Sequence, residues 1–197
     1  MSHVTDETPA SPERARAAAS PDVPSAPYPA RGWRFAVAGV IVVALVVLDQ
    51  LVKAWARTAL ASGPQPLIPG VLRLQLVHNT GAAFSIGEGM GSSFVLLAIA
   101  VTIAVAVYLV RAPHLSRVEV VGLALVVGGA IGNAIDRAVL GSVTDFFATE
   151  FIDFPVFNVA DIGITVGVAV ALIGFICLSP ANKVDATAEL NRRGGRS

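Results

Sequence analysis

The sequence predicts an all-α membrane protein of four transmembrane helices, with a small β-sheet and a loop at the outer membrane surface. Three observations predict this fold class. Hydrophobic residues make up 54% of the 197-residue chain and charged residues only 14%, which is more apolar than soluble domains usually are. The mean hydropathy is +0.70. Four long apolar stretches alternate with short polar segments, as in a multispan helical protein.

The first 33 residues differ in composition from the rest of the chain. They are rich in Pro, Ala, Ser and charged residues and contain almost no large apolar side chains. Such a segment cannot bury enough apolar surface to offset the entropy lost on ordering. We therefore expect a disordered tail over residues 1–33, a membrane domain over 34–178 and a second tail over 179–197.

Each apolar stretch is long enough to cross a bilayer once its flanks are counted. A spanning helix needs about 20 mostly apolar residues. A buried soluble core could explain one such stretch, but four in so short a chain indicate a helical bundle in a membrane. The stretches are residues 35–48, continuing to about residue 55, then 94–110, 118–135 and 162–178.

Basic residues are unevenly distributed around these spans. Ten of the 14 Lys and Arg residues fall on one side of the membrane if both termini lie there. The positive-inside rule makes that side cytoplasmic. Segments 58–93 and 136–161 are then expected outside. The ten residues are Arg14, Arg16, Arg31, Arg34, Arg111, Arg117, Lys183, Arg192, Arg193 and Arg196.

The first outer segment contains a strand signal. Residues 71–76 alternate apolar and polar side chains with a period of two, which is typical of a half-buried strand. Pro64, Pro66, Pro69 and Gly70 precede it and punctuate the chain. We expect a small sheet that rests on the membrane surface with its apolar face down.

Several classes of function lack the residues that they need. A formal net charge of zero argues against a nucleic-acid partner, because no basic face can be assembled. The single cysteine, Cys177, excludes an internal disulfide. His3, His78 and His114 have no metal-ligand spacing with one another. No serine lies in a nucleophile-elbow context, so we expect neither a cofactor nor a metal.

Two acidic residues near the predicted outer surface indicate a possible catalytic pair. Asp145 lies between Thr144 and Phe146 in an apolar setting, and Asp161 opens the last span. A structural alternative for Asp161 is a helix cap. Two carboxylates held close together share a proton, because both cannot easily ionise. One can then activate water while the other donates to a substrate carbonyl, which is the chemistry of peptide hydrolysis.

Other polar residues near the spans have plausible structural roles. Asp49 and Lys53 are four residues apart and are expected to form a local ion pair, with Lys53 reaching to the interface. Asp136 is followed at once by Arg137, which we interpret as a mainly structural pair. Asn133, near the end of an apolar helix, requires a specific partner.

Two further features favour structural rather than catalytic interpretations. Gly128 and Gly132 are four residues apart, a spacing that lets helix backbones approach closely. Glu150 and Asp153 lie in the middle of a loop, where solvated acids are common.

The sequence resembles the lipoprotein signal peptidase family, also called signal peptidase II. Five blocks carry the resemblance, occur in the family's order and cover the chain from about residue 35 to 178. The blocks are Leu-Asp-Gln-Leu-Val-Lys at 48–53, His-Asn-Thr-Gly-Ala-Ala-Phe-Ser at 78–85, Gly-Gly-Ala-Ile-Gly-Asn-Ala-Ile-Asp-Arg at 128–137, Val-Thr-Asp-Phe at 143–146 and Phe-Asn-Val-Ala-Asp at 157–161.

The resemblance implies an intramembrane aspartic endopeptidase. Asp145 and Asp161 match the family's catalytic dyad. The family removes the signal peptide of a prolipoprotein just before a diacylglyceryl-modified cysteine, and the lipid explains why the site lies at the membrane surface. The remaining matched residues border the substrate groove (Asn79, Gly81) or support the dyad and the substrate backbone (Asn133, Asp136, Arg137, Asn158), with Asp49 and Lys53 in the first block.

The resemblance also implies a location and partners. We expect a multi-pass protein of the bacterial plasma membrane, with both termini cytoplasmic and the active site at the extracytoplasmic face. Its expected partners are lipid-modified prolipoproteins and membrane lipids, and it is expected to act as a monomer. Two other interpretations of the acidic pair remain open at this point: an ion or proton site in a transporter, and a structural subunit whose polar residues lock helices together.

Overall fold

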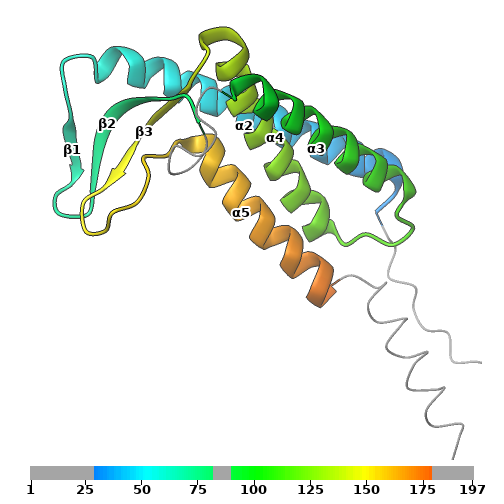
Figure 1. The fold of residues 1–197 in the computed structure, drawn as a ribbon. Coiled ribbons are helices and arrows are strands. Elements are labelled where there is room, and N and C mark those ends of the chain that lie inside the picture. Colours follow the sequence, from blue (N-terminus) through cyan, green and yellow to red (C-terminus); the bar gives the residue numbers. More distant parts are fainter. Residues whose placement is uncertain (1–28, 82–89, 179–197) are drawn as a thin grey trace, which may run out of the picture.

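The computed structural model describes residues 29–81 and 90–178 and contains a helical bundle with a small sheet at one end (Figure 1). Most of the expected tails, 1–28 and 179–197, lie outside the described residues, as do residues 82–85 of the second sequence block. Within the described part, four helical segments are long and apolar enough to cross a membrane. The prediction of four spans is therefore confirmed.

The spans contain four α-helices that follow one another along the chain. They are α2 (Arg31–Ala59), α3 (Gly91–Arg111), α4 (Arg117–Leu140) and α5 (Val159–Ile173). A π-helical segment, η2 (Gly174–Leu178), continues α5. Many large apolar side chains of α2, α3 and α5 are exposed, among them Val43, Leu96 and Ile173. An apolar surface of this extent suits contact with lipid rather than with water.

Capping residues determine where α4 and α5 begin. Ser116 and Glu119 form a capping box at the start of α4, and Asn158 and Asp161 form another at the start of α5. In each box the first side chain accepts from a backbone N–H, while the second accepts from the capping residue's own N–H. Asp161 is therefore the third residue of its helix and not the cap that the sequence alone suggested.

Helix α4 lies between the other helices and packs most closely against α5 (Figure 1). A Cβ atom at Gly129 would lie 2.3 Å from the carbonyl oxygen of Ala160, and one at Gly122 would lie 2.3 Å from the backbone nitrogen of Ala171. The backbones of α4 and α5 can approach this closely only because both positions are glycine.

The glycines that the sequence singled out have a different neighbour. A Cβ atom at Gly128 would meet the side chain of Leu45, and one at Gly132 would lie 2.7 Å from the Oδ2 atom of Asp49. Both contacts are with side chains of α2 rather than with a helix backbone. Gly132 thus makes room for a buried carboxylate, a role that the spacing did not indicate.

The sheet has three antiparallel strands in the order β1-β2-β3. They are β1 (Gln65–Ile68), β2 (Leu72–Asn79) and β3 (Val143–Thr149). The expected strand at 71–76 is confirmed and extends to Asn79. Pro66, interpreted from sequence as punctuation, lies in β1 at the edge of the sheet, where a missing N–H donor is tolerated.

An apolar cluster fixes the sheet against the bundle. Buried Phe146 of β3 packs with Leu74 of β2 and with Ala56 and Leu60 at the end of α2. Along β3 the residue before Phe146 is Asp145, which therefore points to the opposite face of the strand. The cluster thus fixes the strand that carries one of the two candidate carboxylates.

Candidate active site

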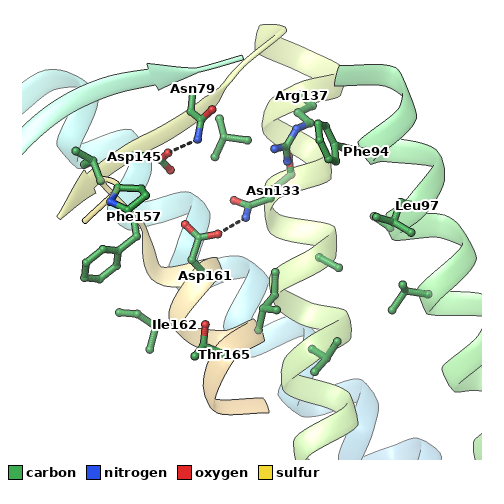
Figure 2. Close-up of a pocket in the computed structure, with 18 of the residues that line it drawn as sticks. Asn79, Phe94, Leu97, Asn133, Arg137, Asp145, Phe157, Asp161, Ile162 and Thr165 are labelled. Carbon is green, nitrogen blue, oxygen red and sulfur yellow. Dashed lines mark hydrogen bonds between the residues drawn. The ribbon is translucent and has the colours of Figure 1, made fainter. Parts of the chain in front are cut away.

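A cavity of about 650 Å³ lies between α3, α4, α5 and the segment that precedes α5. Its walls are mostly apolar, with polar side chains gathered at the end near the sheet (Figure 2). The polar side chains at that end are Asn79, Asn133, Arg137, Asp145 and Asp161. The structure therefore brings together five of the residues that the sequence singled out.

Asp145 enters this cavity from β3 and is 2% exposed. Its two carboxylate oxygens accept from different amides, one 2.6 Å from Asn158 Nδ2 and the other 3.0 Å from Asn79 Nδ2. The antiparallel register pairs Val77 of β2 with Asp145. This register places Asn79, two residues further along β2, within reach of the carboxylate.

Asp161 enters the same cavity from the first turn of α5 (Figure 2). Its Oδ1 atom accepts from Asn133 Nδ2 at 2.8 Å, and its Oδ2 atom accepts from the backbone N–H of Asn158 at 3.0 Å. Because Asn158 also donates to Asp145, one residue fixes the positions of both carboxylates.

The surroundings of Asp145 favour its protonated form. Burial raises the pKa of Asp145 to about 6, and the nearby charge of Asp161 acts in the same direction. The hydrogen bonds from Asn79 and Asn158 and the charge of Lys53 lower the pKa but do not cancel the effect of burial. A carboxyl group with this pKa keeps its proton to a higher pH than an exposed aspartate does and can release it during a reaction.

The amide of Asn133 connects Asp161 to a buried cation. Its Oδ1 atom accepts from Lys53 Nζ at 2.9 Å and from Asn158 Nδ2 at 3.1 Å. Two donors on the oxygen leave the amide only one orientation, in which its Nδ2 atom points to Asp161.

Lys53 lies at the centre of a buried charge cluster. It is fully buried and lies 2.9 Å from Asp49 and 3.5 Å from Asp136. The expected Asp49–Lys53 ion pair is present, but the expectation that Lys53 reaches to the interface was wrong. Two carboxylates and the Asn133 oxygen surround its ammonium group inside the bundle. If the ammonium group moved to the interface, these three acceptors would be buried without their cation.

The expected pairing of Asp136 with Arg137 is also wrong. Asp136 accepts from the backbone N–H of Thr144 at 2.9 Å and from the Gln50 amide at 3.1 Å, and its nearby cation is Lys53. Adjacent residues on a helix point in different directions, so Arg137 turns toward the cavity instead. Asp136 thus joins α4 to the start of β3, directly before Asp145.

Arg137 places a positive charge at the polar end of the cavity. Its Nη2 atom donates to the carbonyl oxygen of Gly81 at 2.8 Å, and its guanidinium carbon lies 4.8 Å from the centre of the Phe94 ring (Figure 2). Gly81 in turn donates its N–H to the Asn79 side chain at 2.9 Å. Asn79 and Gly81 of the second block therefore lie beside Asp145 and Arg137, and their expected place along a substrate groove stays a prediction.

One residue of the site escaped the sequence analysis. Gln50 donates to Asp49, to the carbonyl oxygen of Gly132 and to Asp136. The available signal was a polar amide within an apolar run. The neighbouring residue Asp49 was considered instead. No group of three or more His, Cys, Asp or Glu that could hold a metal occurs among the described residues.

Comparisons with known proteins indicate the family of this chain. A family model described as signal peptidase (SPase) II matches residues 41–177. A lipoprotein signal peptidase from Gloeobacter violaceus is 45% identical over 130 residues, which cover 66% of this chain and 75% of the relative. One from Streptococcus pyogenes serotype M1 is 43% identical over 130 residues, covering 66% and 86%.

Two solved structures, each described as a bacterial membrane enzyme, share the fold. Both are 31% identical to this chain, with TM-scores of 0.67 and 0.66. The first match covers 72% of this chain and 88% of the solved one, and the second covers 73% and 94%.

Proposed function

The chain belongs to the signal peptidase II family, and we propose that it cleaves diacylglyceryl-modified prolipoproteins just before the lipidated cysteine, using an aspartic dyad. The family's activity is the removal of signal peptides from prolipoproteins, so a transporter site and a purely structural subunit are set aside. The observation that carries the proposal is the meeting of Asp145 and Asp161 at the polar end of an apolar cavity.

The two carboxylates have complementary roles in the proposed reaction. Asp145, with its pKa raised to about 6, holds the proton and donates it to the oxygen of the scissile carbonyl. Asp161 accepts a proton from water, and the resulting hydroxide attacks the carbonyl carbon. Collapse of the tetrahedral intermediate breaks the C–N bond, and the amine of the lipidated cysteine leaves with a proton from the dyad.

The residues around the dyad position the substrate and stabilise charge. Arg137 directs a guanidinium group along the cavity wall close to both carboxylates, where it can bind a carbonyl oxygen of the substrate backbone. Asn79, Asn133 and Asn158 hold the carboxylates in place through bonds that exist before substrate arrives. Such preorganisation reduces the rearrangement that the transition state requires.

The apolar part of the cavity suits the lipid of the proposed substrate. Its walls come from α3, α4 and α5, and the described residues that line it away from Asp145, Asp161 and Arg137 include no charged side chain. Acyl chains placed there bury apolar surface while the scissile bond lies at the dyad. The apolar wall residues on the three helices are Phe94, Leu97, Ala98, Val101, Val126, Ala130, Ile162, Ile164 and Val166.

The orientation in the membrane is part of the proposal. The family and the four apolar helices indicate a bacterial membrane protein. With both termini in the cytoplasm, the sheet and the dyad lie at the outer face, where translocated signal peptides end. Reporter fusions at residues 70, 114 and 150 should read outside, inside and outside. An inside signal at residue 150 would contradict this placement.

A cleavage assay with matched peptides tests the function. Purified protein should cleave a prolipoprotein peptide whose cysteine carries a diacylglyceryl group and should leave the same peptide without the lipid intact. Mass spectrometry should place the cut directly before the cysteine. Equal cleavage of both peptides, or cleavage elsewhere, would overturn the proposal. Chelators should leave the rate unchanged.

A further inference from the structure

Among the described residues, Thr165 is the one polar side chain in the part of the cavity wall away from Asp145 and Asp161. It lies four residues after Asp161 on α5, which corresponds to roughly 6 Å along the helix. Every other described residue that lines this part of the cavity is apolar. Figure 2 shows Thr165 on the same side of α5 as Asp161, with its hydroxyl directed toward the aspartate.

The Thr165 hydroxyl has no hydrogen-bond partner among the described residues. A threonine in a helix usually donates to a carbonyl of the preceding turn. Thr102 of α3 does so, since its Oγ1 atom donates to the Ala98 carbonyl oxygen at 2.8 Å. The exposed Thr165 side chain instead offers a free donor to whatever occupies the cavity. In apolar surroundings an unpaired hydroxyl is unfavourable, so a ligand that accepts from it is preferred.

The chemistry of the lipidated cysteine supplies such an acceptor. From the scissile amide nitrogen, the substrate runs through Cα, Cβ, Sγ and the glyceryl carbons to two ester groups, beyond which only acyl chains follow. With the scissile bond at the dyad, this path is long enough for an ester to reach Thr165, which lies about one helical turn from Asp161 along α5. They are the last polar groups before the apolar chains.

We propose that Thr165 donates a hydrogen bond to an ester carbonyl oxygen of the diacylglyceryl group. This inference rests on the proposed function and deepens it, because it makes the enzyme sensitive to how the chains are attached as well as to their presence. A neutral hydrogen bond of this kind changes binding by about 3- to 10-fold. Thr165 is thus a specificity residue rather than a catalytic one.

The test compares two synthetic substrates that differ only at the linkage. One carries the diacyl glyceryl group with two esters, and the other carries a dialkyl group with two ethers, which lack the carbonyl oxygens. Wild-type protein should bind the diester with a KM about 3- to 10-fold lower than that of the diether. Thr165→Val should raise the KM for the diester by the same factor, leaving kcat unchanged, and should not change the KM for the diether.

Two variants serve as matched controls. Thr165→Ser keeps the hydroxyl and should retain the preference for the diester. Thr102→Val removes a hydroxyl that is already bonded within its own helix and does not line the cavity, so both KM values should stay unchanged. An equal effect of Thr165→Val on the two substrates, or no effect, would overturn the inference while leaving the proposed function intact. A wild-type protein that cleaves neither lipidated substrate would overturn both.

Discussion

Lys53 Nζ lies 2.9 Å from the side-chain oxygen of Asn133, a residue eighty positions away in the sequence. This contact connects two systems that would otherwise be separate. On one side is the cluster that Lys53 forms with Asp49 and Asp136. On the other is the Asn133 amide, which holds Asp161 in place. Packing of α2 against α4 and the geometry of the dyad are therefore coupled through one ammonium group.

Lys53→Met should destabilise the protein by about 3–5 kcal/mol, because it leaves Asp49 and Asp136 buried without their cation. The rate of cleavage should fall as well, since the Asn133 amide loses one of the two donors that orient it. Thermal unfolding in detergent micelles measures the first effect. The double variant Lys53→Met/Asp49→Asn removes one stranded charge and should recover part of the lost stability. If Lys53→Met were as stable as the wild type, Lys53 would not stabilise the buried carboxylates of Asp49 and Asp136.

Asp145→Asn and Asp161→Asn should each lower kcat by at least about 100-fold, because neither amide can take or give the required proton. The double variant should be little worse than either single one, since the two residues act as a unit. Asp153→Asn is the matched control: this exposed loop acid should be replaceable without loss. Circular dichroism and membrane insertion should match the wild type. Substantial cleavage by folded Asp145→Asn protein would remove Asp145 from the dyad.

The pH dependence of kcat/KM should report the proton on Asp145. The pKa of Asp145 is raised to about 6. Above this pH, kcat/KM should decrease as the proton donor is lost, with a slope that approaches a tenfold decrease per pH unit. The Asn79 hydrogen bond stabilises the charged form and so lowers this pKa. Asn79→Ala should therefore move the alkaline limb to higher pH.

A neighbouring titratable residue provides the control for the pH profile. His78 precedes Asn79 on β2, and its side chain is exposed. His78→Gln should leave the alkaline limb where it is. If Asn79→Ala shifted the limb to lower pH, or if His78→Gln abolished it, the assignment to Asp145 would be wrong.

Gly129→Ala should reduce both stability and activity. The added Cβ atom would lie 2.3 Å from the Ala160 carbonyl oxygen, which is backbone and cannot rotate away. Helix α5 must then move, which lowers the free energy of unfolding by about 1–3 kcal/mol. The hydrogen bond between Asn133 and Asp161 should lengthen as a result. Gly39→Ala on α2, where no atom from elsewhere in the described part of the chain lies within 4 Å of the added carbon, should leave both properties unchanged. Thermal unfolding and cleavage rates of the two variants would distinguish close packing from a general intolerance of alanine.

The spans and the candidate dyad could be predicted from the sequence because each rests on local chemistry. Apolar residues in a run of sufficient length indicate a span wherever the segment packs. Polar residues at the end of a span are costly, which directs attention to Asn133 and Asp161 without knowledge of their partners. Asp145 attracts attention because it lies between Thr144 and Phe146 in an apolar setting.

The partners themselves depend on tertiary structure and could not be predicted in the same way. The charge beside Asp136 comes from Lys53 on another helix rather than from adjacent Arg137, and no local pattern records such a choice. The pairing of β2 with β3 joins residues more than sixty positions apart. Their register follows from where α4 ends and from the packing of Phe146, which only the folded chain reveals.

The order of the proposed catalytic residues along the chain has a consequence for how this protein is made. Asp145 lies on the strand after the third span and Asp161 in the first turn of the fourth. Asn158, which bonds both carboxylates, lies between them. A nascent chain whose last span has not yet entered the bilayer and packed against Gly129 of α4 therefore has one carboxylate at most in place. On the proposed function, the pair is complete only once the last span has packed, and a chain that lacks this span should not cleave signal peptides.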